Sequence, residues 1–145
     1  MEKGFTGCEK YKIDSKKRIA IPAIMREQLG KDFVLSRGFG DCLALFPSDE
    51  WDIFMHDIST KAPRKKRRTL ELYYNRGAKR MNLDAQGRIY LTPMLLEKAF
   101  LTDEKEAYVL GNNNRIEKWN CSVLDGIDAD ITYDEIEDIL DEAGI

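Results

Sequence analysis

The chain has 145 residues, 43% of them hydrophobic, which is enough to bury the core of one compact domain but not of two independent ones. Its net charge of −3 conceals an asymmetry, because residues 1–120 carry 23 Lys and Arg against 17 Asp and Glu, whereas residues 121–145 carry none against nine. No apolar run is long enough to span a bilayer, and the first four residues are not followed by the apolar core of a signal peptide, so we expect neither a membrane anchor nor a secretory leader.

The first predicted element is a tight turn in the motif D-x-x-x-R at residues 14–18, and the motif returns seventy residues later at 84–88. Apolar and polar residues alternate on either side of both turns, as expected of half-buried hairpins. The alternating apolar residues are Tyr11, Ile13, Ile19 and Ile21 in the first copy and Met81, Leu83, Ile89 and Leu91 in the second. A duplicated turn between strands predicts that the functional site exists at least twice.

Each turn contains residues that can hold its backbone in place. Asp14 and Asp84 stand at the turn starts, where a carboxylate can accept backbone N–H groups, and Gly87 can supply a positive φ without steric cost. Lys17 occupies the place of Gly87 in the first copy and would adopt that conformation at an energetic cost. The plainer interpretation is a capped turn without further role. Both turns also carry cationic or polar side chains, which favours a binding role: Lys16, Lys17 and Arg18 in the first, Gln86 and Arg88 in the second.

A short helix is predicted after each turn. Pro22 and Pro93 occupy the first-turn position at which proline is tolerated, Thr92 can cap the second helix, and Gly30 can end the first. Strand-like runs follow both helices. The order of turn, strand, helix, strand and strand therefore occurs twice, which predicts two half-domains that share one core.

A helical hairpin is predicted between the two copies. Ser48 is a candidate N-cap, and Ala62 with Pro63 interrupts the chain between two helices. Two apolar stripes have helical spacing, one with Trp51, Phe54, Met55 and Ile58 and the other with Leu70, Tyr73 and Tyr74. We interpret these aromatic residues as core rather than as a platform for stacking bases.

Positive charge is concentrated in and after this hairpin. The cations are Lys61, the run from Arg64 to Arg68, Arg76, Lys79 and Arg80. Such a run is often only a solvated face. Together with cationic turns it also fits a protein that follows the phosphates of a nucleic acid.

The acidic tail at residues 121–145 predicts a short amphipathic helix. Thr132 to Glu135 form a capping box, Gly144 can end the helix, and a stripe on one face is apolar. The stripe consists of Ile136, Ile139, Leu140 and Ala143. The helix could cover an apolar patch on its own or a neighbouring subunit, or its carboxylates could compete with phosphate for the basic surface.

Catalysis finds little support in the sequence. His56 is the only histidine and has no partner at ligand spacing, which argues against a histidine-based triad or a zinc site. Asp14 and Asp84 could be the paired carboxylates of a metal-dependent nuclease, but turn capping accounts for both. The three cysteines lack C-x-x-C spacing, which predicts a reduced cytosolic protein without a structural zinc. We expect no enzymatic activity, no metal and no cofactor.

The duplicated motif and its surroundings resemble the MraZ family of transcriptional regulators, which carry two SpoVT/AbrB-type repeats. The resemblance covers approximately residues 1–120 and rests on residues 14–23, 33–38, 42–43, 50–51, 73–74, 84–88 and 115–119. It implies a mixed α+β, β-rich fold, namely a swapped-hairpin, double-ψ-like AbrB barrel made from two internal repeats, with a helical hairpin between them and a C-terminal helix. The expected units are repeats at 1–47 and 81–120, the hairpin at 48–80 and the tail at 121–145.

The resemblance also implies a function. Members of the family form ring oligomers and bind short direct repeats in double-stranded DNA upstream of the division and cell-wall gene cluster, through their D-x-x-x-R motifs. For this chain it implies a cytoplasmic, nucleoid-associated regulator without a small-molecule substrate. The DNA-binding residues would be Lys16, Lys17, Arg18, Gln86 and Arg88.

Two features depart from the family pattern, and two other functions stay open. Lys17 stands where the first motif often has glycine, and the tail beyond Trp119 is longer and more acidic than the resemblance predicts. An AbrB-like antitoxin that binds a basic partner through its acidic tail is the main alternative, although single-copy repeats would be expected there. A metal-dependent nuclease is the third.

Overall fold

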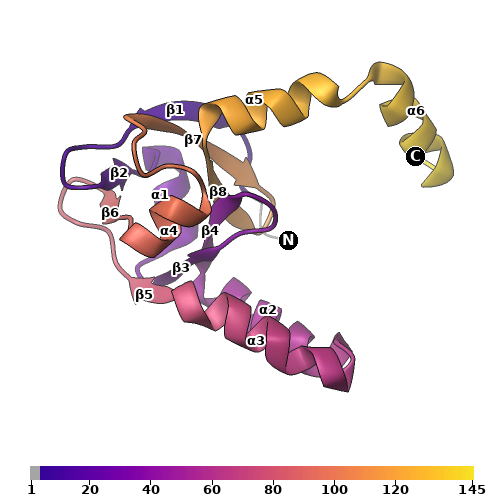
Figure 1. Ribbon diagram of the computed structural model, residues 1–145, viewed down its shortest axis with the longest axis horizontal. Coiled ribbons are helices and arrows are strands. Elements are labelled where there is room, and N and C mark those ends of the chain that lie inside the picture. Colours follow the sequence, from indigo (N-terminus) through magenta and orange to yellow (C-terminus); the bar gives the residue numbers. More distant parts are fainter. Residues whose placement is uncertain (1–3) are drawn as a thin grey trace.

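Eight strands and six helices make up residues 4–145, the part of the chain that the computed structural model describes (Figure 1). Residues 1–3, which belong to the start that we examined for a signal peptide, lie outside the described residues. The strands are β1 (Cys8–Lys12), β2 (Arg18–Ala20), β3 (Phe33–Arg37), β4 (Cys42–Pro47), β5 (Lys79–Met81), β6 (Arg88–Tyr90), β7 (Glu106–Asn112) and β8 (Arg115–Trp119). The helices are α1 (Ala23–Leu29), α2 (Ser48–Lys61), α3 (Arg64–Gly77), α4 (Pro93–Lys98), α5 (Cys121–Asp130) and α6 (Tyr133–Glu142).

The predicted repeat is present as the same order of elements in both halves. Two strands, a short helix and two strands run from β1 to β4, and the same series runs from β5 to β8. Thr92 caps α4 by accepting a hydrogen bond from the Leu95 N–H, as predicted. Gly30, which follows α1, has the positive φ of 81° that favours glycine at a helix end.

The two halves are interleaved through their strands. The main sheet has the order β1-β7-β8-β4-β3-β5, so the first strand of each half pairs with the other half. The predicted hairpins keep their tight turns but are wrong as strand pairs. The Asp14 N–H donates to the Arg18 carbonyl at 2.9 Å and an isolated bridge joins Ile13 to Ile19, but β1 and β2 form no ladder within residues 4–145. β1 instead pairs along its full length with β7, from Cys8 opposite Leu110 to Lys12 opposite Glu106. The longer pairing with the other half satisfies more backbone groups than the local hairpin could.

The six-stranded sheet is open within the described residues. β1 and β5 lie at its two edges, and β2 and β6 form a separate two-stranded sheet. The hydrogen-bonded strands therefore do not close into the barrel that the resemblance implies, whereas the mixed α+β class, the helical pair between the repeats and a C-terminal helix are confirmed.

The main core lies between the interleaved strands and the helices α1 and α4. Its buried residues come from both halves at the positions with alternating apolar character. Among them are Ile13, Ile19, Ile21, Leu35, Leu45, Ile89, Leu91, Val109 and Ile116. Lys118 is also fully buried, and burial lowers the pKa of its amine to about 7.

A second core joins the sheet to the helical hairpin. Val34, Ala44, Phe46 and Trp51 are buried there, with Phe54 and Tyr74 packed against them; the Phe46 and Phe54 rings stack with centroids 5.5 Å apart. The interpretation of the aromatic stripes as core is confirmed for these residues. The predicted cap at Ser48 is wrong, because α2 begins at Ser48 itself and Pro47 precedes it without a side-chain hydrogen bond.

The tail contains two helices rather than the one predicted. Asn120 caps α5 by accepting a hydrogen bond from the Val123 N–H, and the Tyr108 hydroxyl ties α5 to β7 by donating to Asp125 at 2.9 Å. α6 follows and extends away from the rest of the chain (Figure 1). Among residues 4–145, none of the helices combines the length and the apolar character that crossing a membrane requires.

Candidate nucleic-acid interface

The pairing of β2 with β6 places the two D-x-x-x-R turns side by side. Ile19 lies opposite Ile89 in the antiparallel register, so each arginine begins a strand that ends beside the other turn. Hydrogen bonds continue the pairing into the turns, because the N–H of Ile21 donates to the Gly87 carbonyl at 2.9 Å and that of Leu91 to the Lys17 carbonyl at 2.8 Å. Equivalent residues of the two copies thus bond each other in both directions, and the two turns form one pseudo-symmetric surface.

An aspartate at the start of each turn holds the turn backbone. Asp14 Oδ1 accepts the N–H groups of Lys16 and Arg18, each at 2.9 Å. Asp84 Oδ1 accepts those of Gln86 at 2.9 Å and Arg88 at 2.8 Å. These bonds stabilise the ionised carboxylates, and in each case the largest contribution to the lowered pKa is the arginine backbone N–H.

The second carboxylate oxygen of each aspartate orients the arginine of its motif. Arg18 Nε donates to Asp14 Oδ2 at 2.9 Å, and Arg88 Nε donates to Asp84 Oδ2 at 3.0 Å. Both arginine side chains are about a third exposed, at 31% and 27%. Because these bonds use Nε, they fix the direction of the guanidinium and leave its outer nitrogens able to donate elsewhere.

The outer nitrogens of the two arginines differ in their partners. Arg88 Nη2 donates to Gln86 Oε1 at 3.0 Å, and Arg88 Nη1 reaches Asp14 Oδ2 in the other turn at 3.4 Å. Within residues 4–145, the outer nitrogens of Arg18 make no hydrogen bond. Arg18 is therefore the more available donor, whereas Arg88 also links the two turns.

The left-handed position of each turn is occupied as the sequence predicts. Lys17 has a φ of 61° and Gly87 a φ of 74°. The Lys17 amine donates to the Thr102 carbonyl at 2.8 Å, so this predicted DNA contact is engaged within the chain. Over Gly87 lies the guanidinium of Arg26, whose Nε donates to the Ile21 carbonyl at 2.8 Å, and a Cβ at Gly87 would collide with this guanidinium. Sequence reasoning missed Arg26, because the contact joins two segments without a local pattern.

The basic run does not extend the surface formed by the turns. In Figure 1, the beginning of α3 lies at the far tip of the α2–α3 hairpin, across the molecule from β2 and β6. Arg80 points to α2, where it bonds Ser48 Oγ at 3.3 Å and lies 3.6 Å from Asp52. One chain therefore presents two separate cationic surfaces: the paired turns and the start of α3.

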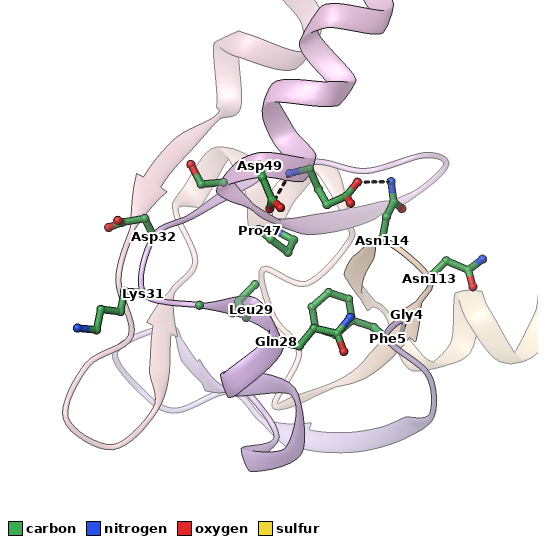
Figure 2. Close-up of a pocket in the computed structure, with 13 residues that line it drawn as sticks. Gly4, Phe5, Gln28, Leu29, Lys31, Asp32, Pro47, Asp49, Asn113 and Asn114 are labelled. Carbon is green, nitrogen blue, oxygen red and sulfur yellow. Dashed lines mark hydrogen bonds between the residues drawn. The ribbon is translucent and has the colours of Figure 1, made fainter. Parts of the chain in front are cut away.

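The paired aspartates are engaged by arginines of the turns, and a cavity in the described residues is lined by other segments. Both carboxylates are engaged with guanidinium groups, and residues 4–145 contain no cluster of three or more His, Cys, Asp or Glu that could hold a metal ion. A cavity of about 480 Å³ opens between the end of α1, the start of α2 and the β7–β8 turn (Figure 2). Asn114 and Glu50 bond at its rim at 3.4 Å, and none of the predicted DNA-binding residues lines it.

Comparisons with known proteins point to one family. Residues 5–72 and 75–122 match the family model of the MraZ protein, described as antitoxin-like. Proteins named "Transcriptional regulator MraZ" from Alkaliphilus oremlandii and Alkaliphilus metalliredigens are 36% and 37% identical, and one from Halothermothrix orenii is 37% identical; each alignment covers 97% of this chain and 99% of the relative. Because the alignments cover nearly the full length of these relatives, the expectation that the tail is unusually long is wrong.

Proposed function

The chain belongs to the MraZ family, and from this membership and the paired turns we propose that it is a transcriptional regulator that binds double-stranded DNA in a sequence-specific manner. The observation that carries the proposal is the placement of two D-x-x-x-R motifs side by side, each with an arginine oriented by an aspartate. The exposed Lys16 and Gln86 flank these arginines on the same turns.

In the proposed mechanism, the two arginines read or brace the DNA from rigid turns. A guanidinium fixed through Nε can present its outer edge to the O6 and N7 atoms of guanine, or to a phosphate, with little loss of conformational freedom. The positive charge of Lys16 strengthens binding to DNA of any sequence. Gln86 accepts a hydrogen bond from Arg88 and so helps to orient it, and its amide N–H groups can donate to a base edge. Lys17 contacts DNA in this proposal only after leaving Thr102.

Assembly completes the proposed mechanism. One pair of turns covers few base pairs, so affinity for short direct repeats requires several subunits in a ring that engage several sites together. We place the operators upstream of the division and cell-wall gene cluster and the protein at the nucleoid. The interleaved pairing of β1 with β7 and of β5 with β3 supports a swapped arrangement related to the AbrB barrel.

The alternative from another class is a protein-binding antitoxin. The family model is described as antitoxin-like, and the exposed acidic α6 offers a surface for a basic partner. The duplicated turns favour DNA, because an acidic-tail antitoxin has no need of two oriented arginine motifs. Co-purification of a small basic protein, released when residues 132–145 are deleted, would favour the alternative.

The test is titration of labelled duplexes by fluorescence anisotropy, with the DNA upstream of the protein's own gene against a shuffled duplex of equal length. We expect tighter binding of the upstream DNA than of the shuffled duplex. The logarithm of the association constant should fall linearly with the logarithm of the salt concentration, and this slope should become less steep by roughly 0.9 for each phosphate contact that a substitution removes. Equal affinity for both duplexes would contradict sequence-specific binding. Light scattering of the same samples should give a mass well above the 16.7 kDa of one chain, and cleavage of the duplex in magnesium would instead indicate a nuclease.

A further inference from the structure

Helix α6 has an apolar face that residues 4–145 leave uncovered. Ile136, Ile139 and Leu140 lie on this face and are 40%, 53% and 39% exposed. Every residue from Ile131 to Ile145 is exposed, and Figure 1 shows α6 beyond the strands and the other helices. A ten-residue helix is marginal in water when isolated, so this face needs a partner.

Both ends of α6 are well defined by hydrogen bonds. Thr132 Oγ1 accepts the Glu135 N–H at 3.1 Å, which is one of the two bonds of the predicted capping box; the reciprocal bond from the Thr132 N–H to the Glu135 carboxylate is not formed among residues 4–145. At the other end Gly144 has a φ of 72°, and the Ile145 N–H closes the last turn on the Leu140 carbonyl at 2.9 Å. The sequence thus specifies a short helix rather than an unstructured acidic tail.

All the charges of α6 are negative, and none is paired within the described residues. The six carboxylates are Asp134, Glu135, Glu137, Asp138, Asp141 and Glu142. No ion pair among residues 4–145 involves any of them. A partner for this helix should therefore combine an apolar centre with a cationic border.

Helix α3 has these properties on its outer face. It contains six cations and one acid, and its cations are Arg64, Lys65, Lys66, Arg67, Arg68 and Arg76. Leu72 is 57% exposed and is flanked one turn away on either side by Arg68 and Arg76. A shallow hollow of about 580 Å³ lies over Leu72, with Glu71 and Asn75 completing its lining. None of the six cations belongs to an ion pair within the described residues.

We propose that α6 of one copy docks on the outer face of α3 in a neighbouring copy. Ile136, Ile139 and Leu140 would lie over Leu72, and the flanking carboxylates would meet the arginines around it. The occupant is a second copy because α3 and α6 lie apart in one chain, with α3 along the lower side of the molecule in Figure 1 and α6 at the upper right beyond α5. Two different surfaces meet in this contact, so repetition of the contact can generate a ring.

The contact gives the basic run a role in assembly rather than in DNA binding. Once α6 covers α3, fewer of the cations from Arg64 to Arg68 remain available to phosphate, and non-specific DNA binding falls. The contact does not depend on the function proposed for the paired turns, and its test contains no DNA. A failure of one proposal is therefore distinguishable from a failure of the other.

The test uses one substitution in each half of the contact. Ile139→Asp damages α6, and Leu72→Asp damages the outer face of α3; both positions are exposed, so the sheet and both cores should stay folded in each variant, which the near-ultraviolet circular dichroism of the buried Trp51 and Trp119 measures even where α6 frays without its partner. Light scattering should show a lower mass for each variant than for the unaltered protein. Ile24→Asp, at an isoleucine of α1 that is 88% exposed, is the matched control and should leave the mass unchanged.

Mixing the two variants gives the sharper result. The intact α6 of the Leu72→Asp chain can dock on the intact α3 of the Ile139→Asp chain, whereas the reverse contact has both sides damaged. We expect a complex of two different chains with twice the 16.7 kDa of one chain. If either substitution misfolds the chain, Leu72→Gln or deletion of residues 132–145 replaces it. An unchanged mass in folded single variants would overturn the proposal. The absence of a complex on mixing would overturn it too, and would indicate that α6 docks on its own chain or on another partner.

Discussion

The two turns of the paired site share the hydrogen bonds made by their aspartates but differ in their surroundings. In each, an aspartate caps the backbone and orients an arginine, and the fourth residue has a positive φ. Lys17 fills that position in the first turn and extends to the Thr102 carbonyl, whereas Gly87 in the second lies beneath the Arg26 guanidinium. The hydrogen bonds between the aspartate and the arginine therefore fix the shape of each turn. The group that packs over the fourth residue decides which amino acid fits there: a lysine in the first turn and a glycine in the second.

The arginines differ in the same way. Arg88 touches both aspartates and Gln86, whereas Arg18 bonds only Asp14 among residues 4–145. The second turn is thus more tightly held, and the first has the freer guanidinium.

The largest expected effect is on DNA affinity. Arg18→Ala and Arg88→Ala should each weaken binding to the upstream duplex by roughly 10- to 100-fold, because an arginine contact to a base is worth about 1–3 kcal/mol. Fluorescence anisotropy at fixed salt measures both. Lys10→Ala, which removes one positive charge from β1, is the control and should cost much less. Unaltered affinity in a folded double variant Arg18→Ala/Arg88→Ala would contradict the proposed function.

The next effect is on stability and concerns the residue at the positive φ. Gly87→Lys should lower the free energy of unfolding by about 2 kcal/mol, because a side chain there is strained and displaces Arg26 from the Ile21 carbonyl. Lys17→Gly should change it by no more than about 0.5 kcal/mol, because the relief of strain offsets the loss of the Thr102 contact. Urea denaturation compares the two. Equal losses in both variants would show that the turns are interchangeable.

Local features of these turns were predictable, whereas their partners were not. The capping by Asp14, the positive φ of Lys17 and the cap at Thr92 follow from neighbouring residues, so the sequence contains the information. Alternation of apolar residues identifies a strand but not the strand that it pairs with, and the pairing of β1 with β7 could not be deduced from it.

The same limit applies to the candidate site. The repeat indicated two similar turns, but their contact through β2 and β6 depends on the tertiary fold. The bond from Arg88 to Asp14 and the position of Arg26 over Gly87 join residues far apart in the chain. Helix α5 was missed for a different reason, because its signal at Asn120 is local and could have been recognised as an N-cap.

A smaller effect should separate the two arginines in stability. Arg88→Ala should lower the free energy of unfolding by about 1 kcal/mol, since it removes contacts in both turns, and Arg18→Ala by about 0.5 kcal/mol, since it removes one partly exposed ion pair. Both values come from urea denaturation at pH 7. A larger loss for Arg18→Ala would mean that the link between the turns contributes little.

The smallest effect is in the titration of the two aspartates. Both have a pKa below the usual 3.8, mainly because the N–H of Arg18 or Arg88 bonds the ionised form. A carboxyl whose pKa is lowered by folding stabilises the protein fully above its unfolded pKa, and this contribution is lost as the pH falls through the folded pKa. The free energy of unfolding should therefore decline below about pH 4, and it should decline less in the double variant Asp14→Asn/Asp84→Asn.

The titration of each aspartate can be followed separately by the chemical shift of its carboxyl carbon in NMR spectra. Arg18→Ala should raise the pKa of Asp14 alone, whereas Arg88→Ala should raise the pKa of Asp84 and, to a smaller extent, that of Asp14. If Arg88→Ala leaves the Asp14 titration unchanged, the 3.4 Å contact between the turns has no measurable electrostatic effect.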